Sequence, residues 1–242
     1  MRIQKYLSQQ NIVSRRKAEE YLLKGLIKVN GVVITTLGFQ IDPDKDKIEI
    51  DYQIKQIQQN YIYLAFHKPK GYFTNCPEIG EKEIKDILPK KFAHLSAIGR
   101  LDKDSEGLIL LSDDGIFAKT ILNAEHPHTR RYRVWINHPL SDQAKKQLES
   151  GVSILGKFTK PVTIEMIHPN SFIIVMNEGR NRQIRRMLYS VGCTVIGLKR
   201  LSFGQVELAG LKSGEFRLLS SAEVDSFSSL KQASHSRQNP RH

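Results

Sequence analysis

The chain has 242 residues, of which 40% are hydrophobic, enough for one large domain or two modest ones with a real core. Its 37 lysines and arginines against 25 acids give a net charge of +12, which favours a polyanionic partner, with nucleic acid ahead of an acidic membrane surface. No apolar run approaches the roughly 18 residues of a membrane span. The N-terminus lacks the apolar stretch of a signal peptide, and Cys76 and Cys193 are too few for a disulfide framework or a cysteine zinc site. We therefore expect a cytoplasmic protein without a membrane partner.

Residues 1–50 are predicted to form a compact unit of two short helices and a hairpin. Apolar residues recur at helical spacing at the start of the chain, at Ile3, Tyr6 and Leu7. Ser14 is a suitable N-cap for a second helix, and Gly25 is a suitable end. Asn30-Gly31 is the strongest short-range signal for a hairpin, because a type I′ turn needs two residues that tolerate positive φ.

This unit carries a surplus of positive charge. Glu19 and Glu20 are the only acids among residues 1–31, and their spacing to Arg15 and Arg16 allows i, i+4 pairs that merely cover a helix. Two acids cannot neutralise the seven basic side chains, which are Arg2, Lys5, Arg15, Arg16, Lys17, Lys24 and Lys28. The surplus favours a surface that faces phosphate groups.

The rest of the chain is predicted to hold a linker, an α+β domain and a tail. Residues 51–60 are polar, glutamine-rich and free of strong turn residues, which indicates a linker. Strands and helices alternate irregularly over residues 61–222. Strands are predicted at 61–68, 108–111, 130–136 and 171–176, and a helix at 141–151. Residues 223–242 are polar, basic and rich in serine, so we expect a disordered tail.

The familiar signatures of nucleotide-dependent and hydrolytic enzymes are absent from the sequence. It has no glycine-rich phosphate loop, no dinucleotide fingerprint and no G-x-S-x-G turn. His126 and His128 lie two residues apart beside a proline, but no further cluster of ligands accompanies them. We therefore do not expect a metal site.

The stretch IGRLDKDSEGLILLSDDG, residues 98–115, combines acids, bases and glycines around an apolar strand. Arg100-Leu101-Asp102 precedes residues 103–107, which are predicted to form an exposed turn. A carboxylate at this place either takes part in chemistry or simply solvates a loop, and the second case is the ordinary one. The stretch alone does not decide between them.

Residues 178–192, EGRNRQIRRMLYSVG, are predicted to form a helix that is capped by Asn181 and ends at Gly192. Its buried face is expected to consist of Ile184, Met187, Leu188 and Val191. Positive charge at a helix N-terminus opposes the helix dipole, yet four arginines crowd the first turns, namely Arg180, Arg182, Arg185 and Arg186. Either an anion docks there or these arginines pair with acids elsewhere in the fold.

Three segments together resemble the bacterial ribosomal pseudouridine synthases of the RsuA type. Ser14-Arg15-Arg16-Lys17 and Lys28-Val29-Asn30-Gly31 resemble an αL-type RNA-binding motif. GRLDKDSEGLILLSDDG resembles the family's catalytic motif, and EGRNRQIRRM its C-terminal signature. GRLDKDS, GVSILG and NRQIRRM are most similar to the RluF branch, which modifies large-subunit ribosomal RNA. The resemblance covers residues 1–220 and implies an α+β fold, in which a small N-terminal αL-type RNA-binding domain precedes a pseudouridine synthase domain with a mixed, mostly antiparallel bent sheet.

This resemblance implies the isomerisation of uridine to pseudouridine in ribosomal RNA, without a cofactor. Asp102 matches the family's catalytic aspartate, Tyr132 its active-site tyrosine, which is expected to stack on the base, and Arg185 the basic residue expected to pair with the aspartate. The implied RNA-binding residues are Arg2, Lys5, Ser14, Arg15, Arg16, Lys17, Lys24, Lys28, Arg100, Arg180, Arg182 and Arg186. Because the target uridine must leave folded RNA, Arg100 is expected to take its vacated stacking place. We expect a monomer with large-subunit ribosomal RNA as its partner.

Three other functions fit parts of the sequence. A ribosome-assembly factor would use the same basic surfaces but would not need Asp102. A DNA-binding protein would show a recognition helix, and none stands out. A glycoside hydrolase needs a well-placed pair of carboxylates, for which Asp102 and Asp104 are the nearest candidates.

Overall fold

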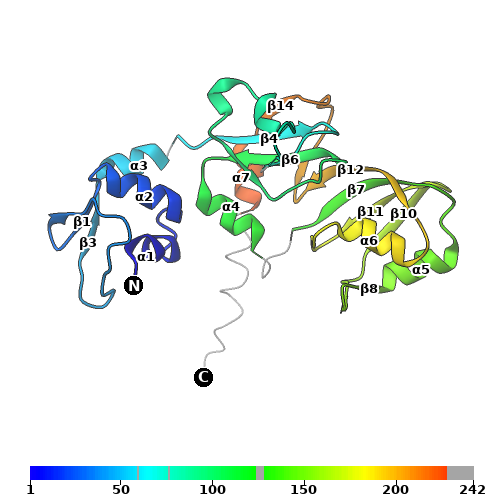
Figure 1. Ribbon diagram of the computed structural model, residues 1–242, viewed down its shortest axis with the longest axis horizontal. Coiled ribbons are helices and arrows are strands. Elements are labelled where there is room, and N and C mark those ends of the chain that lie inside the picture. Colours follow the sequence, from blue (N-terminus) through cyan, green and yellow to red (C-terminus); the bar gives the residue numbers. More distant parts are fainter. Residues whose placement is uncertain (59, 76, 124–127, 228–242) are drawn as a thin grey trace. The chain divides into compact units, whose positions relative to one another are not determined.

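The computed structural model describes residues 1–58, 60–75, 77–123 and 128–227 (Figure 1). Two compact units divide the chain. The first comprises residues 1–62 and 112–120, and the second comprises residues 63–111 and those from 121 onward. In the parts of the chain that are described, no helix combines the length and apolar character needed to cross a membrane.

The N-terminal unit packs helices against a small sheet in which β1 lies between β2 and β3. Its elements are α1 (Ile3–Gln9), α2 (Arg15–Leu23), β1 (Ile27–Val29), β2 (Val32–Val33), β3 (Ile48–Ile50) and α3 (Tyr52–Gln58). The predicted cap is confirmed, because the Ser14 hydroxyl accepts a hydrogen bond from the Lys17 backbone amide at 3.4 Å. The predicted hairpin is confirmed as well, since Asn30 and Gly31 have φ of 52° and 79°.

Residues 51–60 are not the linker that their polarity indicated. Residues 52–58 of this stretch form α3, whose Ile54 is fully buried in the core of the N-terminal unit. Ile57 lies one helical turn further on and packs against the same core, and the Gln58 side chain donates a hydrogen bond to the Ile12 carbonyl at 2.6 Å. Glutamine is a good helix former, so two apolar residues among glutamines are enough to dock a helix.

The second unit is built on a mixed sheet with the strand order β10-β11-β7-β12-β6-β4-β14. Its strands are β4 (Tyr63–Lys68), β5 (Ser96–Ile98), β6 (Glu106–Ser112), β7 (Arg130–Ile136), β8 (Ser153–Ile154), β9 (Lys157–Phe158), β10 (Thr163–His168), β11 (Ser171–Met176), β12 (Val195–Phe203), β13 (Val206–Glu207) and β14 (Phe216–Leu218). β12 runs parallel to β6, whereas the pairs β10–β11, β11–β7, β7–β12 and β14–β4 are antiparallel. The α+β fold with a mostly antiparallel sheet is therefore confirmed.

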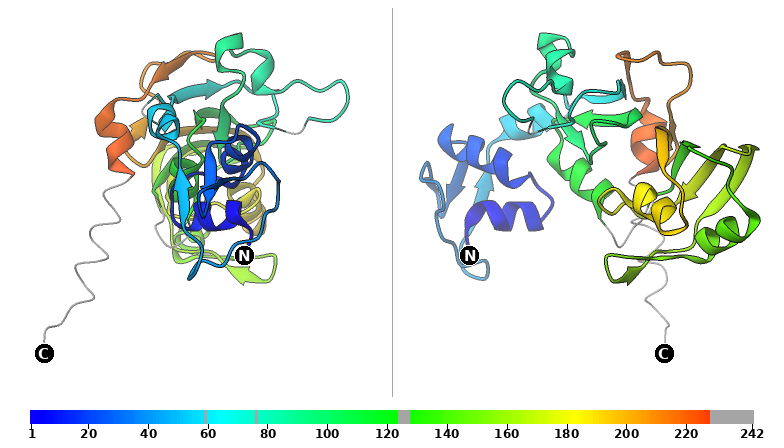
Figure 2. Two further views of the ribbon diagram at one scale, coloured as in Figure 1. Left: turned by 90° about the vertical axis from the view of Figure 1, so that its left-hand side faces the viewer. Right: turned by 45° about the vertical axis from the view of Figure 1, so that its right-hand side comes forward.

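The helices of the second unit are α5 (Asp142–Ser150), α6 (Gln183–Ser190) and α7 (Ser221–Ser226), with short 3₁₀ turns at Ile84–Asp86 and Lys90–Phe92. Helix α4 (Gly115–Leu122) follows β6, and most of it belongs to the first unit. α5 and α6 pack beside β10 and β12, as Figure 2 shows. The predicted apolar run of β6 is buried throughout, because a central strand is covered on both faces.

The C-terminal prediction is partly wrong. A disordered tail was expected from residue 223, but α7 extends to Ser226 and begins with a capping box between Ser220 and Glu223. Phe227 is fully buried, and its ring meets the rings of His128 and Phe203 edge-on. One aromatic residue and one capping box thus order a serine-rich stretch. The rest of the predicted tail, residues 228–242, lies outside the described residues, as does His126.

Candidate active site

Asp102 lies on the loop between β5 and β6, and the backbone beside it is held from both sides. The Thr74 hydroxyl donates to the Leu101 carbonyl at 2.7 Å and accepts from the Leu101 amide at 3.0 Å. Thr74 is buried, so neither backbone group can turn to water without breaking these bonds. Leu101 is thereby fixed one residue before the carboxylate.

A buried lysine holds the other end of this loop. Lys68, at the end of β4, is fully buried, and its ammonium group donates to the Ser105 and Pro69 carbonyls at 2.7 and 2.9 Å. Burial lowers the pKa of Lys68 to about 8, although the charge of Asp102 opposes this shift. Sequence reasoning assigned Lys68 only to the end of a strand. The sequence signal that could have indicated its burial is its position at the end of a strongly apolar strand.

The turn after Asp102 is less exposed than predicted. Ser105 is buried, and Glu106 and Gly107 already belong to β6. Gly107 has φ of 109°, and a Cβ there would lie 2.3 Å from the Arg200 carbonyl oxygen. Only glycine allows this close approach between β6 and β12. The loop is therefore short and tightly bound to the sheet.

Two guanidinium groups face the Asp102 carboxylate. Its Oδ2 lies 3.4 Å from Arg182 Nη1 and 3.9 Å from Arg185 Nε. The Arg185 side chain is largely buried and donates to the Val195 and Asp104 carbonyls, each at 3.2 Å. Burial, the largest cause, and the neighbouring Arg182 lower the pKa of Arg185. The predicted pairing of Arg185 with Asp102 is present, and Arg182 shares it.

The start of α6 differs from the prediction. Asn181 is not its N-cap: that position is Arg182, which has φ of 50° and makes no side-chain cap bond. The Gln183 side chain instead binds the segment before the helix, accepting from the Arg180 amide at 2.8 Å and donating to Glu178 at 2.6 Å. Of the predicted apolar face, Ile184, Met187 and Leu188 are buried, whereas Val191 is half-buried.

A pocket of about 80 Å³ brings the predicted catalytic residues together. Its wall includes Asp102, Arg185 and Tyr132, which is buried on β7. Three of the arginines expected to bind RNA line it too, namely Arg100, Arg180 and Arg182. Asp102 is the only carboxylate among the described residues of its wall, and neither Asp104 nor Glu106 contributes.

Two of the predicted RNA-binding arginines, Arg180 and Arg186, are bound by neighbouring groups of the protein. Arg180 pairs with Glu178 at 3.2 Å and donates to the Phe158 carbonyl at 2.7 Å. Arg186 lies outside the 80 Å³ pocket and donates to the Asn181 carbonyl and side-chain oxygens, both at 3.1 Å. Their role toward RNA remains a prediction.

In the N-terminal unit the basic side chains predicted to bind RNA are exposed, except that Lys17 is half-buried. Ser14, the one uncharged residue of the predicted set, is half-buried as well. The alternative interpretation, in which Arg15 and Arg16 pair with Glu19 and Glu20, does not hold, because these pairs are not formed. Lys17 takes Glu20 at 3.1 Å instead, and within the described ranges no carboxylate lies within 4.0 Å of Arg15 or Arg16. The Ser14 hydroxyl is engaged in capping α2.

Comparisons with known proteins show the family of this chain. The profile of the family described as RNA pseudouridylate synthase matches residues 62–190, and that of the S4 domain matches residues 1–46. A solved structure described as a pseudouridylate synthase superposes with a TM-score of 0.69 at 26% identity, covering 94% of this chain and 99% of that one.

Three curated relatives match nearly the whole chain. The dual-specificity RNA pseudouridine synthase RluF of Escherichia coli O6:H1 is 34% identical over 97% of this chain and 81% of its own length. The ribosomal large subunit pseudouridine synthase B of Bacillus subtilis is 33% identical, over 92% of this chain and 93% of its own. The ribosomal small subunit pseudouridine synthase A of Yersinia pestis is 32% identical, over 93% and 97%. The chain therefore belongs to the RNA pseudouridylate synthases, in the RsuA-type group that carries an N-terminal RNA-binding S4 domain.

Proposed function

We propose that this chain isomerises a uridine of ribosomal RNA to pseudouridine in the cytoplasm, with Asp102 as the catalytic carboxylate. The observation that carries the proposal is the pocket in which Asp102 is the only carboxylate of the described wall, beside Tyr132 and two guanidinium groups. A glycoside hydrolase would need a second carboxylate across the pocket. In a protein that only binds RNA, a carboxylate such as Asp102 among arginines that face phosphate groups would weaken binding.

The reaction needs one carboxylate and a means of holding the base. The N1–C1′ bond breaks, the base turns, a C5–C1′ bond forms, and the proton lost from C5 is balanced by one gained at N1. An ionised Asp102 serves either as nucleophile, on C1′ of the sugar or C6 of the base, or as the base that takes a proton from C2′. Tyr132 supplies an aromatic wall against which the uracil stacks.

A nucleoside that reaches the Asp102 carboxylate must displace Arg182, whose Nη1 lies 3.4 Å from the Asp102 Oδ2. Of the two arginines that face the carboxylate, Arg182 is the better able to move, because its side chain is 44% exposed and that of Arg185 is 15% exposed. The uridine then displaces Arg182 from Asp102, while Arg185 keeps its carbonyl bonds and its place beside the carboxylate. Arg100, also in the wall, fills the stack that the uridine leaves.

Large-subunit ribosomal RNA is the proposed substrate. Its support is the likeness of GRLDKDS, GVSILG and NRQIRRM to the RluF branch, together with the identities to the RluF and large-subunit relatives. Mapping pseudouridine in both ribosomal RNAs, with and without the gene, tests the assignment. A site lost from the small-subunit RNA alone would overturn the choice of subunit and leave the reaction standing.

Replacing Asp102 tests the catalytic assignment. Asp102→Asn keeps the shape of the side chain and removes its charge, so tritium release from C5-labelled uridine should fall by about 10⁴-fold or more. Asp104→Asn is the matched control, because its side chain lies outside the pocket wall and should leave most of the activity. RNA affinity should stay equal or rise slightly. Wild-type turnover in Asp102→Asn would favour an assembly factor instead.

A further inference from the structure

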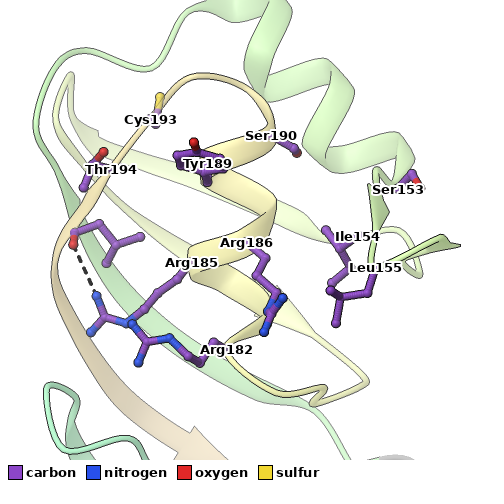
Figure 3. Close-up of a pocket in the computed structure, with 11 residues that line it drawn as sticks. Ser153, Ile154, Leu155, Arg182, Arg185, Arg186, Tyr189, Ser190, Cys193 and Thr194 are labelled. Carbon is purple, nitrogen blue, oxygen red and sulfur yellow. Dashed lines mark hydrogen bonds between the residues drawn. The ribbon is translucent and has the colours of Figure 1, made fainter.

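A second and larger cavity lies beside the proposed active site, with a volume of about 490 Å³. It lies between α6, the β8–β9 hairpin and the start of β12, and Figure 3 shows the side chains that line it. Arg182 and Arg185 line both this cavity and the Asp102 pocket, so the two share a wall. The volume falls in the range of sites that hold small molecules.

Exposed apolar groups form the rim of this cavity. Tyr189 of α6 is 78% exposed and Leu155 of the hairpin is 72% exposed. Leu155 also has φ of 50°, in a two-residue turn where glycine, asparagine or aspartate is the ordinary choice. A strained and solvated leucine stabilises nothing in its own fold. An apolar or aromatic occupant would cover it.

The other side of the cavity is cationic. Figure 3 shows Arg182, Arg185 and Arg186 at the N-terminal end of α6, with Leu155 on the hairpin opposite Arg186. None of the described lining residues is acidic. The bonds of Arg186 to Asn181 fix its guanidinium, and no carboxylate of the described chain lies within 4.0 Å to compensate its charge. Cations beside an apolar rim suit a phosphate attached to a flat base.

We propose that this cavity is a second nucleotide site, which takes an unpaired nucleotide of the substrate RNA next to the uridine at Asp102. This rests on the proposed function, because it needs RNA at the Asp102 pocket. Extrusion of the uridine breaks stacking on both sides, and the shared arginines Arg182 and Arg185 place the two sites within reach of neighbouring nucleotides of one strand. The neighbouring base stacks on Tyr189 and Leu155, and its phosphate meets Arg186.

Substitution of the apolar rim tests the site through substrate binding. Tyr189→Ala and Leu155→Asn should each raise KM for a ribosomal RNA fragment about tenfold, as expected for one lost stacking contact, with kcat unchanged. Leu218→Asn is the matched control, since Leu218 is a similarly exposed leucine on β14 outside the cavity. Asparagine accepts the left-handed turn at 155, so Leu155→Asn should raise Tm while it weakens binding. Raised Tm with unchanged KM would overturn the proposal.

A fluorescent base locates the occupant directly. We would place 2-aminopurine at each position flanking the target uridine and bind the RNA to the Asp102→Asn protein. Stacking should quench one flanking position, and adding Tyr189→Ala should restore its fluorescence. Absence of any Tyr189-dependent quenching would overturn the second site. Failure of the wild type to form pseudouridine would instead overturn the proposed function, and the two results are independent because the binding assay needs no turnover.

Discussion

The two cationic regions of this protein hold their charges in opposite ways. In the N-terminal unit, Arg15 and Arg16 project from α2 as exposed side chains without a described carboxylate in ion-pair range. At the start of α6, Arg185 is bound to two carbonyls and faces Asp102. The same residue type is solvated in one place and fixed by the fold in the other.

This difference separates affinity from chemistry. Exposed arginines that meet phosphate contribute through counterion release, so each is replaceable and sensitive to salt. An arginine held by carbonyls cannot follow a mobile phosphate, but it keeps a carboxylate and a loop in one geometry. Removing the first kind should weaken binding, and removing the second kind should slow turnover.

Between these two regions, the larger effect is expected at Arg185. Arg185→Met leaves the Val195 and Asp104 carbonyls without their donor, so kcat should fall about 100-fold while Kd for RNA stays nearly constant. Arg185→Lys should not restore turnover, because an ammonium cannot reproduce the planar fork. Arg182→Met is the comparison, and it should weaken binding more than turnover since Arg182 is the more exposed. Single-turnover rates and filter binding measure both. Equal loss of binding from both variants would mean one undifferentiated patch.

The next effect concerns Thr74, which holds the backbone beside Asp102. Thr74→Val keeps the shape but leaves the Leu101 amide and carbonyl unsatisfied, which should lower the free energy of unfolding by about 1–3 kcal/mol. Looser placement of Asp102 should also reduce kcat, with KM unchanged. Thr74→Ser retains the hydroxyl and should restore both. Denaturant unfolding measures the stability, and steady-state kinetics measure kcat and KM. Equal stability and equal kcat in Thr74→Val and Thr74→Ser would contradict the role given to the hydroxyl.

A smaller effect is expected from the N-terminal unit. Substituting both Arg15 and Arg16 with Gln should raise KM on ribosomal RNA and reduce the salt slope of binding by about one per lost phosphate contact. The charge of Lys17 is already paired with Glu20, so Lys17→Gln should change the slope less. Binding isotherms over a range of salt concentrations make the comparison. A lowered kcat with unchanged KM in the variant with Gln at both Arg15 and Arg16 would contradict the assignment of affinity to the N-terminal unit and of turnover to the start of α6.

Local signals in the sequence were enough to predict much of this fold. Ser14, Asn30-Gly31 and the apolar run of β6 act on their immediate neighbours, and the structure confirms each. Such features can be predicted because the physical cause lies within a few residues of its effect. The pairing of Asp102 with Arg185 joins distant segments, and its prediction depended on the resemblance of their two motifs to the RsuA-type synthases.

What the sequence did not reveal depends on contacts between distant segments. The partner of Thr74 is Leu101, and the partner of Lys68 is Ser105, at separations of 27 and 37 residues. The spacing of apolar residues does not predict which hydroxyl or ammonium group will bind a backbone carbonyl in the folded chain. α3 was missed for a related reason, because only docking on the N-terminal core distinguishes a glutamine-rich helix from a linker.

A separate effect, on stability and not on turnover, is a pH dependence that originates from Lys68. Its pKa is about 8 in the folded chain, against an ordinary value of 10.5. Between these two values the unfolded chain holds more protons than the folded one, so raising the pH stabilises the folded state. Below about pH 8 the cost of burying the charge is fully present, and above about pH 10.5 it is fully relieved.

Comparison with a variant isolates this contribution. The free energy of unfolding of the wild type minus that of Lys68→Met should rise from pH 8 to 10.5 and level off outside that window. Lys70→Met, at an exposed lysine two residues further along, is the matched control. Denaturant unfolding at several pH values provides the measurement. A difference that stays flat across the window would mean that the carbonyls of Pro69, Lys103 and Ser105, which surround the Lys68 ammonium group, compensate the burial of its charge. Holding the loop beside Asp102 would then carry no cost in stability.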